Sequence, residues 1–185
     1  MKLTRDFFDR PALAVARELL GKVLVVEAAG RRRAGRIVDC EAYVGQHDLA
    51  CHASKGRTPR TEVMFGPPGF AYVFLVYGMH HCFNAVTGAP GLAAAVLVRA
   101  VEPVEGLEGR GRSDGPGRVC RALGINRSHD GVDLCGGRGP FLEDGPGIAR
   151  RRVERGPRIG VAYAGAWAKR PYRFWVAGSP FVSGQ

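Results

Sequence analysis

The stretch YVFLVYGMH, residues 72–80, joins two strand patterns through a short turn. Phe70 to Val76 is rich in aromatic and β-branched residues, and His80 to Thr87 continues the apolar pattern, which predicts a pair of β-strands. The turn between them, Tyr77-Gly78-Met79, carries two large apolar side chains. We therefore expect a protruding β-hairpin with an apolar tip.

The apolar tip has two interpretations. A loop of the same chain could cover it, so that Tyr77 and Met79 belong to the ordinary core. If the tip is exposed instead, it is a liability in a soluble monomer unless it is used. An aromatic wedge can enter between base pairs and fill the gap left by an extruded nucleotide. The second interpretation predicts a protein that opens a nucleic-acid duplex.

Further elements are expected on both sides of the hairpin. Strands are predicted over Lys22–Ala28, Gly35–Tyr43, Leu92–Val101, Ile159–Tyr163 and Tyr172–Val176. Helices are predicted from a cap at Asp9, with Pro11 just inside it, to Gly21, and over Arg118–Leu123. Residues 44–60 and 126–157 are predicted to be loops. The pattern indicates an α+β fold, a single domain over residues 1–185 with a curved, mostly antiparallel β-sheet core, flanking short helices and the protruding hairpin.

The composition favours a polyanionic partner. The chain has 185 residues and a net charge of +10, and most of its positive side chains are arginine, since lysine occurs only at positions 2, 22, 55 and 169. Arginine pairs bidentately with phosphate oxygens, which favours nucleic acid. An arginine-rich composition also follows from a GC-rich genome, so the charge alone leaves both explanations open.

Cysteine usage and the N-terminus favour a cytoplasmic protein. Five cysteines with no C-x-x-C pair disfavour a disulfide framework and a zinc ribbon. The N-terminus lacks the apolar region of a signal peptide, and the longest apolar run, Leu92–Val98, is too short to span a bilayer. We expect no membrane segment.

The predicted strand over residues 37–44 has two different faces. The apolar face consists of Val38, Cys40, Ala42 and Val44, and the other face of Asp39, Glu41 and Tyr43. Two carboxylates and an aromatic ring on one face are either a solvated surface or a catalytic group. In the second case a carboxylate deprotonates a water molecule beside a stacked ring.

Arg99 stands in an otherwise apolar predicted strand. A guanidinium there either reaches solvent at the end of the sheet or needs an anionic partner, because an unpaired buried charge is very unfavourable. If Arg99 approaches Glu41, it favours the ionised carboxylate and keeps a general base charged at neutral pH.

Three other groups of residues have both a functional and a structural interpretation. Metal-ligand residue types occur together at positions 47, 48, 51 and 52, but their spacing matches no strong metal motif, and we expect neither a metal nor a cofactor. Asn84 is either a satisfied sheet position or a residue that lines a pocket. The basic loop Lys55–Arg60 is either a phosphate contact or a solvated loop.

Several segments, in the same order, resemble the alkyladenine (3-methyladenine) DNA glycosylase family of base-excision repair. The resemblance covers roughly Phe8 to Val182 and is carried by Ala14 with Arg17–Gly21, Asp39–Tyr43, Arg57–Arg60, Met64–Phe65, Tyr72–Met79, Cys82–Asn84, Leu97–Pro103, Gly115–Gly117 and Gly178–Pro180. It implies an enzyme that flips alkylated or deaminated purines out of double-stranded DNA. It also implies that an activated water hydrolyses the N-glycosidic bond and leaves an abasic site.

The resemblance implies roles for single residues as well. Glu41 is expected to be the general base, and Arg99 the second group that holds the water. The expected pocket residues are Tyr43, His52, Phe74, Asn84, Leu97 and Ile159, the last acting through its backbone carbonyl. The expected DNA contacts are Thr58, Arg60, Met64, Tyr77 and Met79, with Tyr77 inserted into the duplex.

The chain departs from the family pattern at three places. Phe74 stands where a tyrosine is often found, His80 stands where an aromatic residue is often found, and the loop before Thr58 is one residue shorter. These departures concern the substrate range more than the type of reaction.

A bifunctional enzyme would need an amine nucleophile, and of the four lysines only Lys55 lies near a proposed site segment. We therefore expect a monofunctional purine DNA N-glycosylase that acts as a monomer. Two alternatives stay open. One is a non-catalytic nucleic-acid-binding protein, and the other is a metal-dependent nuclease that uses Asp39, Glu41 and His52.

Overall fold

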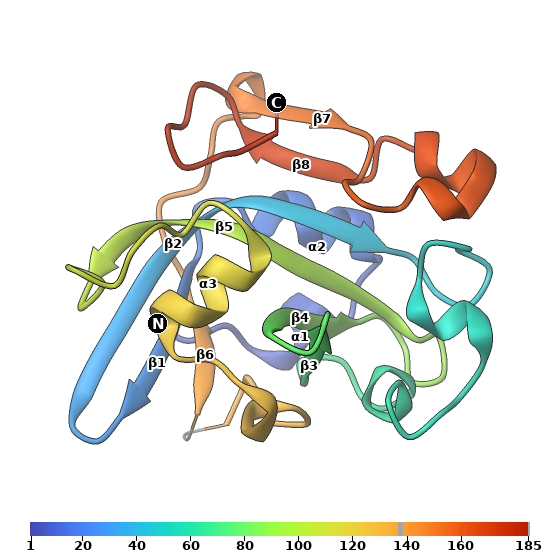
Figure 1. Ribbon diagram of the computed structural model, residues 1–185, viewed down its shortest axis with the longest axis horizontal. Helices are drawn as coiled ribbons and strands as arrows, with labels where there is room; N and C mark the ends of the chain where they lie inside the picture. Colours follow the sequence, from blue (N-terminus) through green and yellow to red (C-terminus); the bar gives the residue numbers. More distant parts are fainter. Residues whose placement is uncertain (137–138, 185) are drawn as a thin grey trace.

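Strand β2, Arg31–Tyr43, organises the sheet in the computed structural model, which describes residues 1–136 and 139–184. Strand β5, Ala94–Glu105, pairs with one edge of β2 along most of its length, and Figure 1 shows the two crossing the molecule side by side. Two shorter strands share the other edge, β1, Val23–Ala28, and β8, Arg173–Val176. Strand β2 therefore changes partner near Asp39, where its ladder with β5 contains a bulge.

The other strands extend this sheet. They are β3, Ala71–Val76, β4, His80–Thr87, β6, Pro140–Glu143, and β7, Val153–Gly156. The order is β3-β4-β5-β2-β1-β6, with β7 beside β8, and the strand pairs are antiparallel. The predicted α+β fold with a curved antiparallel sheet is therefore confirmed.

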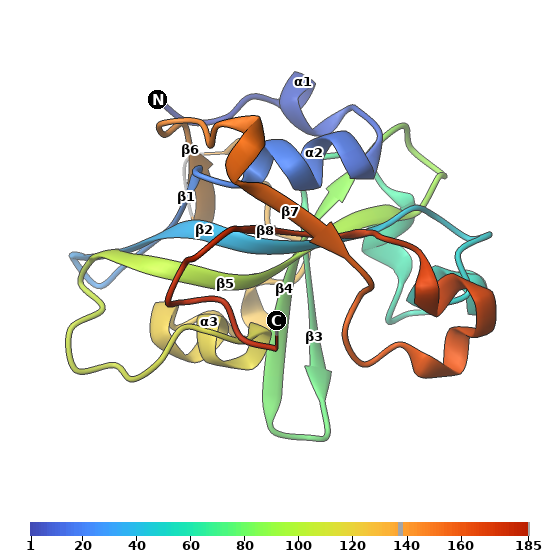
Figure 2. The same cartoon turned by 90° about the horizontal axis from the view of Figure 1, so that it is seen from above.

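Short helices cover the sheet. The α-helices are α1, Arg5–Phe8, α2, Ala12–Leu19, and α3, Pro116–Leu123. The 3-10 helices are η1, His52–Lys55, η2, Glu62–Phe65, η3, Arg127–His129, η4, Arg150–Arg152, and η5, Ala162–Lys169. Figure 2 shows α2 and α3 on opposite sides of β2 and β5, and both helices bury an apolar stripe there. Within the described residues, no helix is long and apolar enough to cross a membrane.

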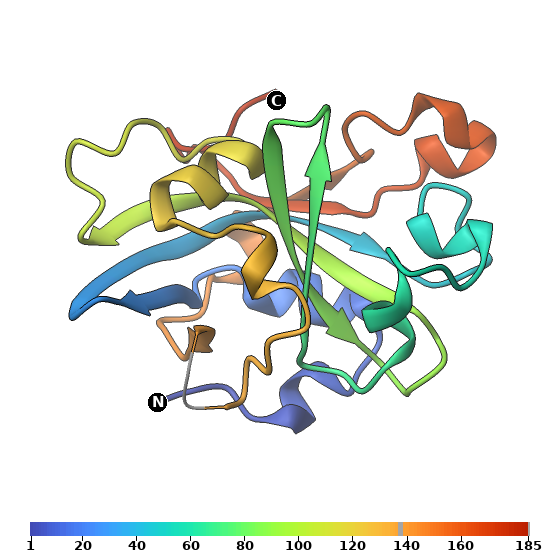
Figure 3. The same ribbon diagram turned by 60° about the horizontal axis from the view of Figure 1, so that its bottom comes forward.

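The hairpin formed by β3 and β4 projects from the rest of the chain, as Figures 2 and 3 show. The N–H of Met79 donates to the carbonyl of Val76, and both Tyr77 and Gly78 have positive φ, as in a turn of type I′, while three residues separate the paired Val76 and His80. The Tyr77 side chain is 91% exposed and Met79 is 69% exposed. The predicted protruding hairpin is confirmed, and the alternative that a loop covers its tip is wrong.

The predicted strand over Ile159–Tyr163 is wrong. Gly160 has a φ of 77°, which interrupts the extended conformation, and η5 begins at Ala162. The apolar residues of this segment instead form a small cluster, in which Val161 and Ala164 pack with Ala50. The alternation of apolar residues therefore reflects this cluster and no pairing with the sheet.

The prediction that residues 126–157 form only loops is also wrong, because β6 and β7 lie within them. Strand β6 begins with Pro140 and lies at the end of the sheet, where a missing N–H does not disrupt a ladder. Its Phe141 and Leu142 are buried against β1. The glycines and arginines around this short strand obscured it in the sequence.

Several element boundaries differ from the prediction, among them that of β5, which covers Ala94–Glu105 and not Leu92–Val101. Strand β2 begins at Arg31 and not at Gly35, since the turn consists of Ala29 and Gly30, both with positive φ. The helix α2 has Pro11 as its N-cap, whereas Asp9 follows the separate short helix α1. The remaining predicted strands and both predicted helices are present.

Candidate active site

A cavity of about 300 Å³ opens beside the hairpin. Its size lies at the lower end of the range of about 300–1,000 Å³ that is usual for small-molecule sites. The lining residues come from β2, β3, β4 and β5, from the segment around η1 and η2, and from residues 159–163. They include Glu41, Tyr43, Cys51, His52, Met64, Tyr72, Phe74, Tyr77, Cys82, Asn84, Leu97, Arg99, Ile159, Val161 and Tyr163. Sequence segments that are far apart thus meet in one hollow.

Glu41 lines this cavity, and its side chain is fully buried. Its Oε1 atom accepts a hydrogen bond of 2.8 Å from the backbone N–H of Ile159 and lies 3.2 Å from Nη1 of Arg99. Its Oε2 atom accepts a hydrogen bond of 2.8 Å from the hydroxyl of Tyr43. The interpretation of this strand face as a solvated surface is wrong, and so is the alternative that Arg99 reaches solvent.

Neighbouring strands bring these groups together. Glu41 in β2 stands opposite Leu97 in β5, and Arg99 lies two residues further along β5. Because alternate residues of a strand share a face, Asp39 also faces Arg99, at 3.6 Å from its Nε atom. Asp39 is held at 2.8 Å by Arg173 in β8. Two buried carboxylates and two buried guanidiniums therefore balance one another across three strands.

Burial governs the titration of the site. It raises the pKa of Glu41 above the ordinary value, and the Arg99 charge and two hydrogen bonds lower that pKa only in part. Burial also raises the pKa of Tyr43 well above its ordinary value, so the phenol keeps its proton and donates a hydrogen bond to Glu41. Arg99 favours ionisation as expected, but Glu41 still ionises at a higher pH than an exposed glutamate.

Aromatic rings form one wall of the cavity. The His52 ring meets Phe74 edge-on at a centroid distance of 4.6 Å, and its Nδ1 atom lies 2.9 Å from the Tyr72 hydroxyl. The Arg60 guanidinium lies over the other side of the wall, 5.2 Å from the Phe74 centroid. Burial, helped by the Arg60 charge, lowers the pKa of His52 to about 4, so this histidine is neutral at neutral pH. The rings of the wall are therefore uncharged, and the charge of Arg60 lies next to them.

Asn84 is both a hydrogen-bonded sheet residue and a residue that lines the cavity, so both interpretations made from the sequence hold. It lies in β4 opposite Tyr72 in β3 and Leu97 in β5, and its Nδ2 atom donates to the Tyr72 carbonyl at 3.0 Å. The side chain is buried and also lines the cavity. A sheet contact thus fixes the position of a polar group in the cavity wall.

Ile159 is brought to the cavity by a segment that is not part of the sheet. Its side chain is 39% exposed, and its backbone N–H faces Glu41. The family resemblance singled out the carbonyl of this residue, whereas the N–H is the group that contacts the carboxylate. The role of the carbonyl stays a prediction.

The residues expected to contact DNA fall into two groups. Thr58 and Arg60 are exposed on the loop between η1 and η2, where the Thr58 hydroxyl lies 3.1 Å from that of Thr61. Met64 is instead 2% exposed and lines the cavity. Because of this burial, Met64 can touch only a nucleotide that has entered the cavity.

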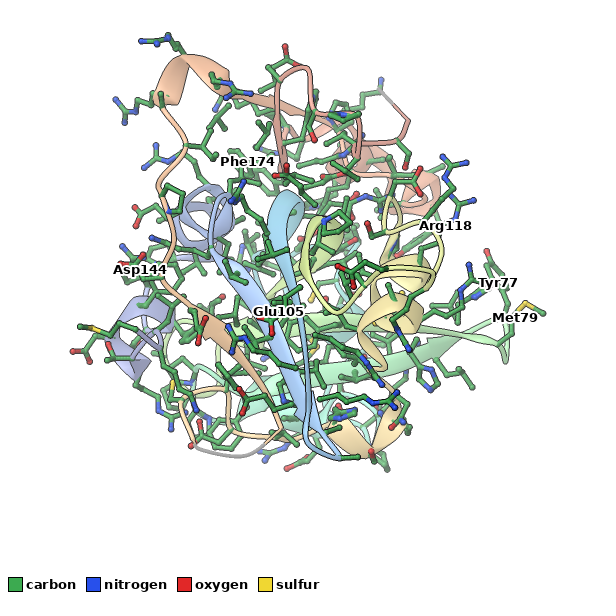
Figure 4. The ribbon with its side chains drawn as sticks, turned by 90° about the vertical axis from the view of Figure 1, so that its left-hand side faces the viewer. Tyr77, Met79, Glu105, Arg118, Asp144 and Phe174 are labelled. Carbon is green, nitrogen blue, oxygen red and sulfur yellow. The ribbon has the colours of Figure 1, made fainter. Side chains whose placement is uncertain are left out.

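The hairpin tip lies at the edge of the cavity. Figure 4 shows Tyr77 and Met79 at the outer end of the hairpin. Tyr77 borders the cavity and also a second hollow of about 500 Å³. The residues that line this second hollow include His80, Arg118 and Arg121. The hairpin therefore stands between an aromatic cavity and a basic hollow.

The residue types considered as metal ligands are held apart by other contacts. Asp48 pairs with Arg158, which the sequence did not single out, and His47 meets the Trp167 ring edge-on at 5.5 Å. The Cys51 thiol faces the carbonyl of Ala93. Among residues 1–136 and 139–184, no three histidine, cysteine or acidic side chains are grouped so that they could hold a metal ion.

Comparison with known proteins extends this description. The family model of methylpurine-DNA glycosylase (MPG) matches residues 6–180. A protein of Myxococcus xanthus (strain DK1622), named "Putative 3-methyladenine DNA glycosylase", is 63% identical over 183 residues, which cover 98% of this chain and 93% of its own. Proteins of the same name from Methanocella arvoryzae and Legionella pneumophila (strain Corby) are 50% and 46% identical, and each match covers 98% of this chain and at least 95% of theirs.

The resemblance seen in single segments of the sequence is thus confirmed over almost the whole chain. The match includes β2, the hairpin and β5, which supply most of the cavity. It also includes residues 159–163, which close the cavity from outside the sheet. The chain belongs to the methylpurine-DNA glycosylase family.

Proposed function

We propose that this protein flips alkylated or deaminated purines out of double-stranded DNA and hydrolyses their N-glycosidic bond, leaving an abasic site. It acts as a monomer and needs no cofactor. The observation that carries the proposal is the fully buried carboxylate of Glu41 in an aromatic cavity beside an exposed hairpin tip. The names of the relatives support 3-methyladenine as one of the substrates.

Glu41 has one free position for a water molecule. A carboxylate accepts about four hydrogen bonds, two on each oxygen. The Ile159 N–H donates to Oε1, which also forms an ion pair with Arg99, and Tyr43 occupies one position of Oε2. The remaining lone pair of Oε2 accepts a hydrogen bond from water and takes its proton when the water attacks the sugar carbon. The negative charge also stabilises the oxocarbenium-like sugar of the transition state.

The aromatic wall suits a cationic base. Alkylation of a purine nitrogen gives a positively charged ring, which binds to aromatic faces by stacking and cation–π attraction. Tyr43 and Phe74 supply such faces, and neutral His52 adds no repulsive charge. Leu97 and Met64 fill the rest of the wall, and the bulk of Asn84 excludes the exocyclic amino group of guanine.

The hairpin opens the duplex. Tyr77 enters between base pairs and occupies the space that the extruded purine leaves, while Met79 contacts the neighbouring bases. Thr58 and Arg60, both exposed, contact the DNA from the opposite rim. A damaged base pairs weakly, so its extrusion requires less free energy than that of a normal base.

The reaction is monofunctional. Strand cleavage by a glycosylase needs an amine that forms a Schiff base with the sugar. No lysine is among the described residues that line the cavity, and Lys55 points to the outside on η1. Borohydride treatment during turnover should therefore trap no protein–DNA adduct, and a trapped adduct would contradict this part of the proposal.

The test is a single-turnover base-release assay in EDTA, on duplexes that carry hypoxanthine, ethenoadenine or an alkylated purine. Wild type is compared with Glu41→Gln and with the matched control Glu105→Gln, which changes an exposed carboxylate on β5 in the same way. The proposal expects release by wild type and by the control, and loss of release in Glu41→Gln with duplex binding retained.

Other outcomes separate the alternatives. Binding to duplex DNA without release of any lesion would support a non-catalytic nucleic-acid-binding protein. Strand cleavage that requires a divalent metal and stops in EDTA would support the metal-dependent nuclease. Either result would overturn the proposed function.

A further inference from the structure

Asp48 and Arg158 form a buried ion pair next to the Glu41 site. Both side chains are completely buried, and the guanidinium of Arg158 contacts both carboxylate oxygens of Asp48, at 2.5 Å and 2.8 Å. The guanidinium also donates to the carbonyl of Ala42 at 2.9 Å. Neither residue touches the reacting atoms of the proposed mechanism.

The pair holds the backbone on both sides of Tyr43. Arg158 binds the carbonyl of Ala42, which precedes Tyr43, and Asp48 accepts a hydrogen bond of 3.2 Å from the N–H of Val44, which follows it. The guanidinium carbon of Arg158 lies 4.7 Å from the centroid of the Tyr43 ring. The position of the Tyr43 hydroxyl against Glu41 therefore depends on this pair.

The pair also fixes the amide that contacts Glu41. Ile159 follows Arg158 directly, in a segment for which the described residues show no strand pairing. Gly160, the next residue, has a φ of 77°, and a Cβ atom there would meet nothing within 4 Å. Arg158 is thus the side-chain anchor that directs the Ile159 N–H towards Oε1 of Glu41.

Stability alone does not explain such a pair. Removing two charges from water is unfavourable, and apolar residues of similar volume often replace buried ion pairs with no loss of stability. The hydrogen bonds of this pair go to the backbone of residues 42, 44, 50 and 167, and the first three of these line the cavity or adjoin Tyr43, which lines it.

We propose that Asp48 and Arg158 are positioning residues for base hydrolysis, which hold Tyr43 and the Ile159 amide against Glu41. The inference rests on the proposed function. Both held groups donate hydrogen bonds to the ionised carboxylate. Loosening them makes ionisation of Glu41 less favourable and lets the carboxylate turn away from the attacking water.

The test compares the charge-conserving variants Arg158→Lys and Asp48→Glu with Arg5→Lys as matched control. Arg5 also bridges an aspartate, Asp133, and a backbone carbonyl, that of Pro68, but it lies outside the cavity. Single-turnover base release is measured at saturating enzyme from about pH 5 to pH 9, with the active fraction determined by titration. Thermal unfolding and duplex binding are measured on the same samples.

The expected loss in Arg158→Lys is about 10- to 100-fold at neutral pH, as for a misplacement on the order of 1 Å in a reacting group. Duplex binding and the control are unchanged. The acid limb of the pH profile moves to higher pH, because a lost hydrogen bond to the carboxylate raises the pKa of Glu41. The loss is therefore larger at acidic than at alkaline pH, and Asp48→Glu, which keeps the charge of the pair but displaces it, repeats the shift.

A folded Arg158→Lys variant with normal release and an unmoved acid limb would overturn the inference. So would a loss that is equal at every pH and matches a reduced active fraction, since that indicates a purely structural role. If Arg158→Lys does not fold, the acid limb of Asp48→Glu decides in the same way. Wild type that releases no base from any lesion would instead overturn the proposed function, and the inference with it.

Discussion

The cavity floor around Glu41 and the tip of the β3–β4 hairpin belong to the same sheet but are built in opposite ways. At the floor, a charged side chain is fully buried, and charge and hydrogen bonds hold both its oxygens. At the tip, a large aromatic side chain is almost fully exposed on a backbone with positive φ. A charged group is thus shielded from water at the floor, and an apolar group is exposed to water at the tip.

Each arrangement is unfavourable for folding and suits a different step of the proposed reaction. A preorganised, desolvated carboxylate acts on the chemical step, because its orientation needs no rearrangement during the reaction. An exposed ring acts on the opening of the duplex, because it replaces a base in the stack. Changes at the floor should therefore alter the rate of base release, and changes at the tip should alter lesion binding.

The largest effect is expected from Glu41→Gln. Loss of a general base should lower the single-turnover rate by about 10²- to 10⁴-fold at saturating enzyme. Duplex affinity should remain that of wild type, because the tip is untouched. Quenched-flow base release, together with a binding titration on an uncleavable lesion analogue, checks both parts. If Glu41→Gln lowers the affinity as much as the rate, the claim that the floor acts on the rate and the tip on binding is wrong.

The next largest effect is expected from Tyr77→Ala. Stacking of an aromatic side chain on a base contributes about 1–3 kcal/mol, so lesion-duplex affinity should fall roughly 5- to 150-fold. Tyr77→Phe keeps the ring and serves as the matched control, with an affinity close to that of wild type. Fluorescence of a base analogue next to the lesion reports stacking and extrusion. A Tyr77→Ala variant with wild-type affinity would show that the tip does not enter the duplex.

The pH dependence of base release tests whether Glu41 at the floor is the group that must ionise. Glu41 acts only when ionised, and burial raises its pKa, so the acid limb of base release should lie above the ordinary range of a glutamate. Below that limb the rate should fall about tenfold per pH unit. His52, with a pKa lowered to about 4, stays neutral over this range. His52→Gln should therefore leave the midpoint of the limb in place, and a shift would assign the limb to the histidine.

The same shift has a consequence for stability, with a defined sign. The pKa of Glu41 is higher in the folded than in the unfolded chain, so the folded state binds the proton more tightly and loses stability as pH rises through that raised pKa. Glu41→Gln removes this loss. The unfolding temperature of the variant relative to wild type should thus increase from about pH 4 to pH 7, by calorimetry. A constant difference would contradict the buried carboxylate.

The smallest effect is expected at the turn itself. Gly78 has a φ of 68°, and a Cβ atom there would meet nothing within 4 Å, so Gly78→Ala introduces backbone strain without a clash. Strain of this kind amounts to about 1–2 kcal/mol, which denaturant unfolding resolves. A larger loss in the free energy of unfolding would show that the conformation of the tip affects the packing of the core.

The two regions also differ in how they could be predicted. The hairpin and the polar face of β2 follow from the alternation of residues next to each other in the chain. The alternation left open whether Tyr77 is covered and whether Glu41 faces solvent, and only the family resemblance favoured the exposed Tyr77 and the inward Glu41. The contact of Arg99 with Glu41 follows from an energetic argument, because a guanidinium in an apolar strand needs an anion. These parts depend only on local patterns.

The rest of the site depends on tertiary contacts. The Ile159 amide and the Asp48–Arg158 pair lie in segments without regular strands, and backbone groups leave no pattern in a sequence. Apolar alternation around Val161 predicted a strand, whereas the residues pack in a small cluster. Arg158 was detectable only as one arginine among many. Its burial is decided by partners that are distant in the chain.

The long sequence separations of these contacts have a consequence for folding. The hairpin strands are neighbours in the chain, whereas the contact of Ile159 with Glu41 spans 118 residues and that of Arg173 with Asp39 spans 134 residues. Contacts of high sequence separation close large loops and form slowly. The hairpin closes a much shorter loop than the contact that brings the Ile159 amide to Glu41. We therefore expect the complete set of Glu41 contacts to form after the hairpin.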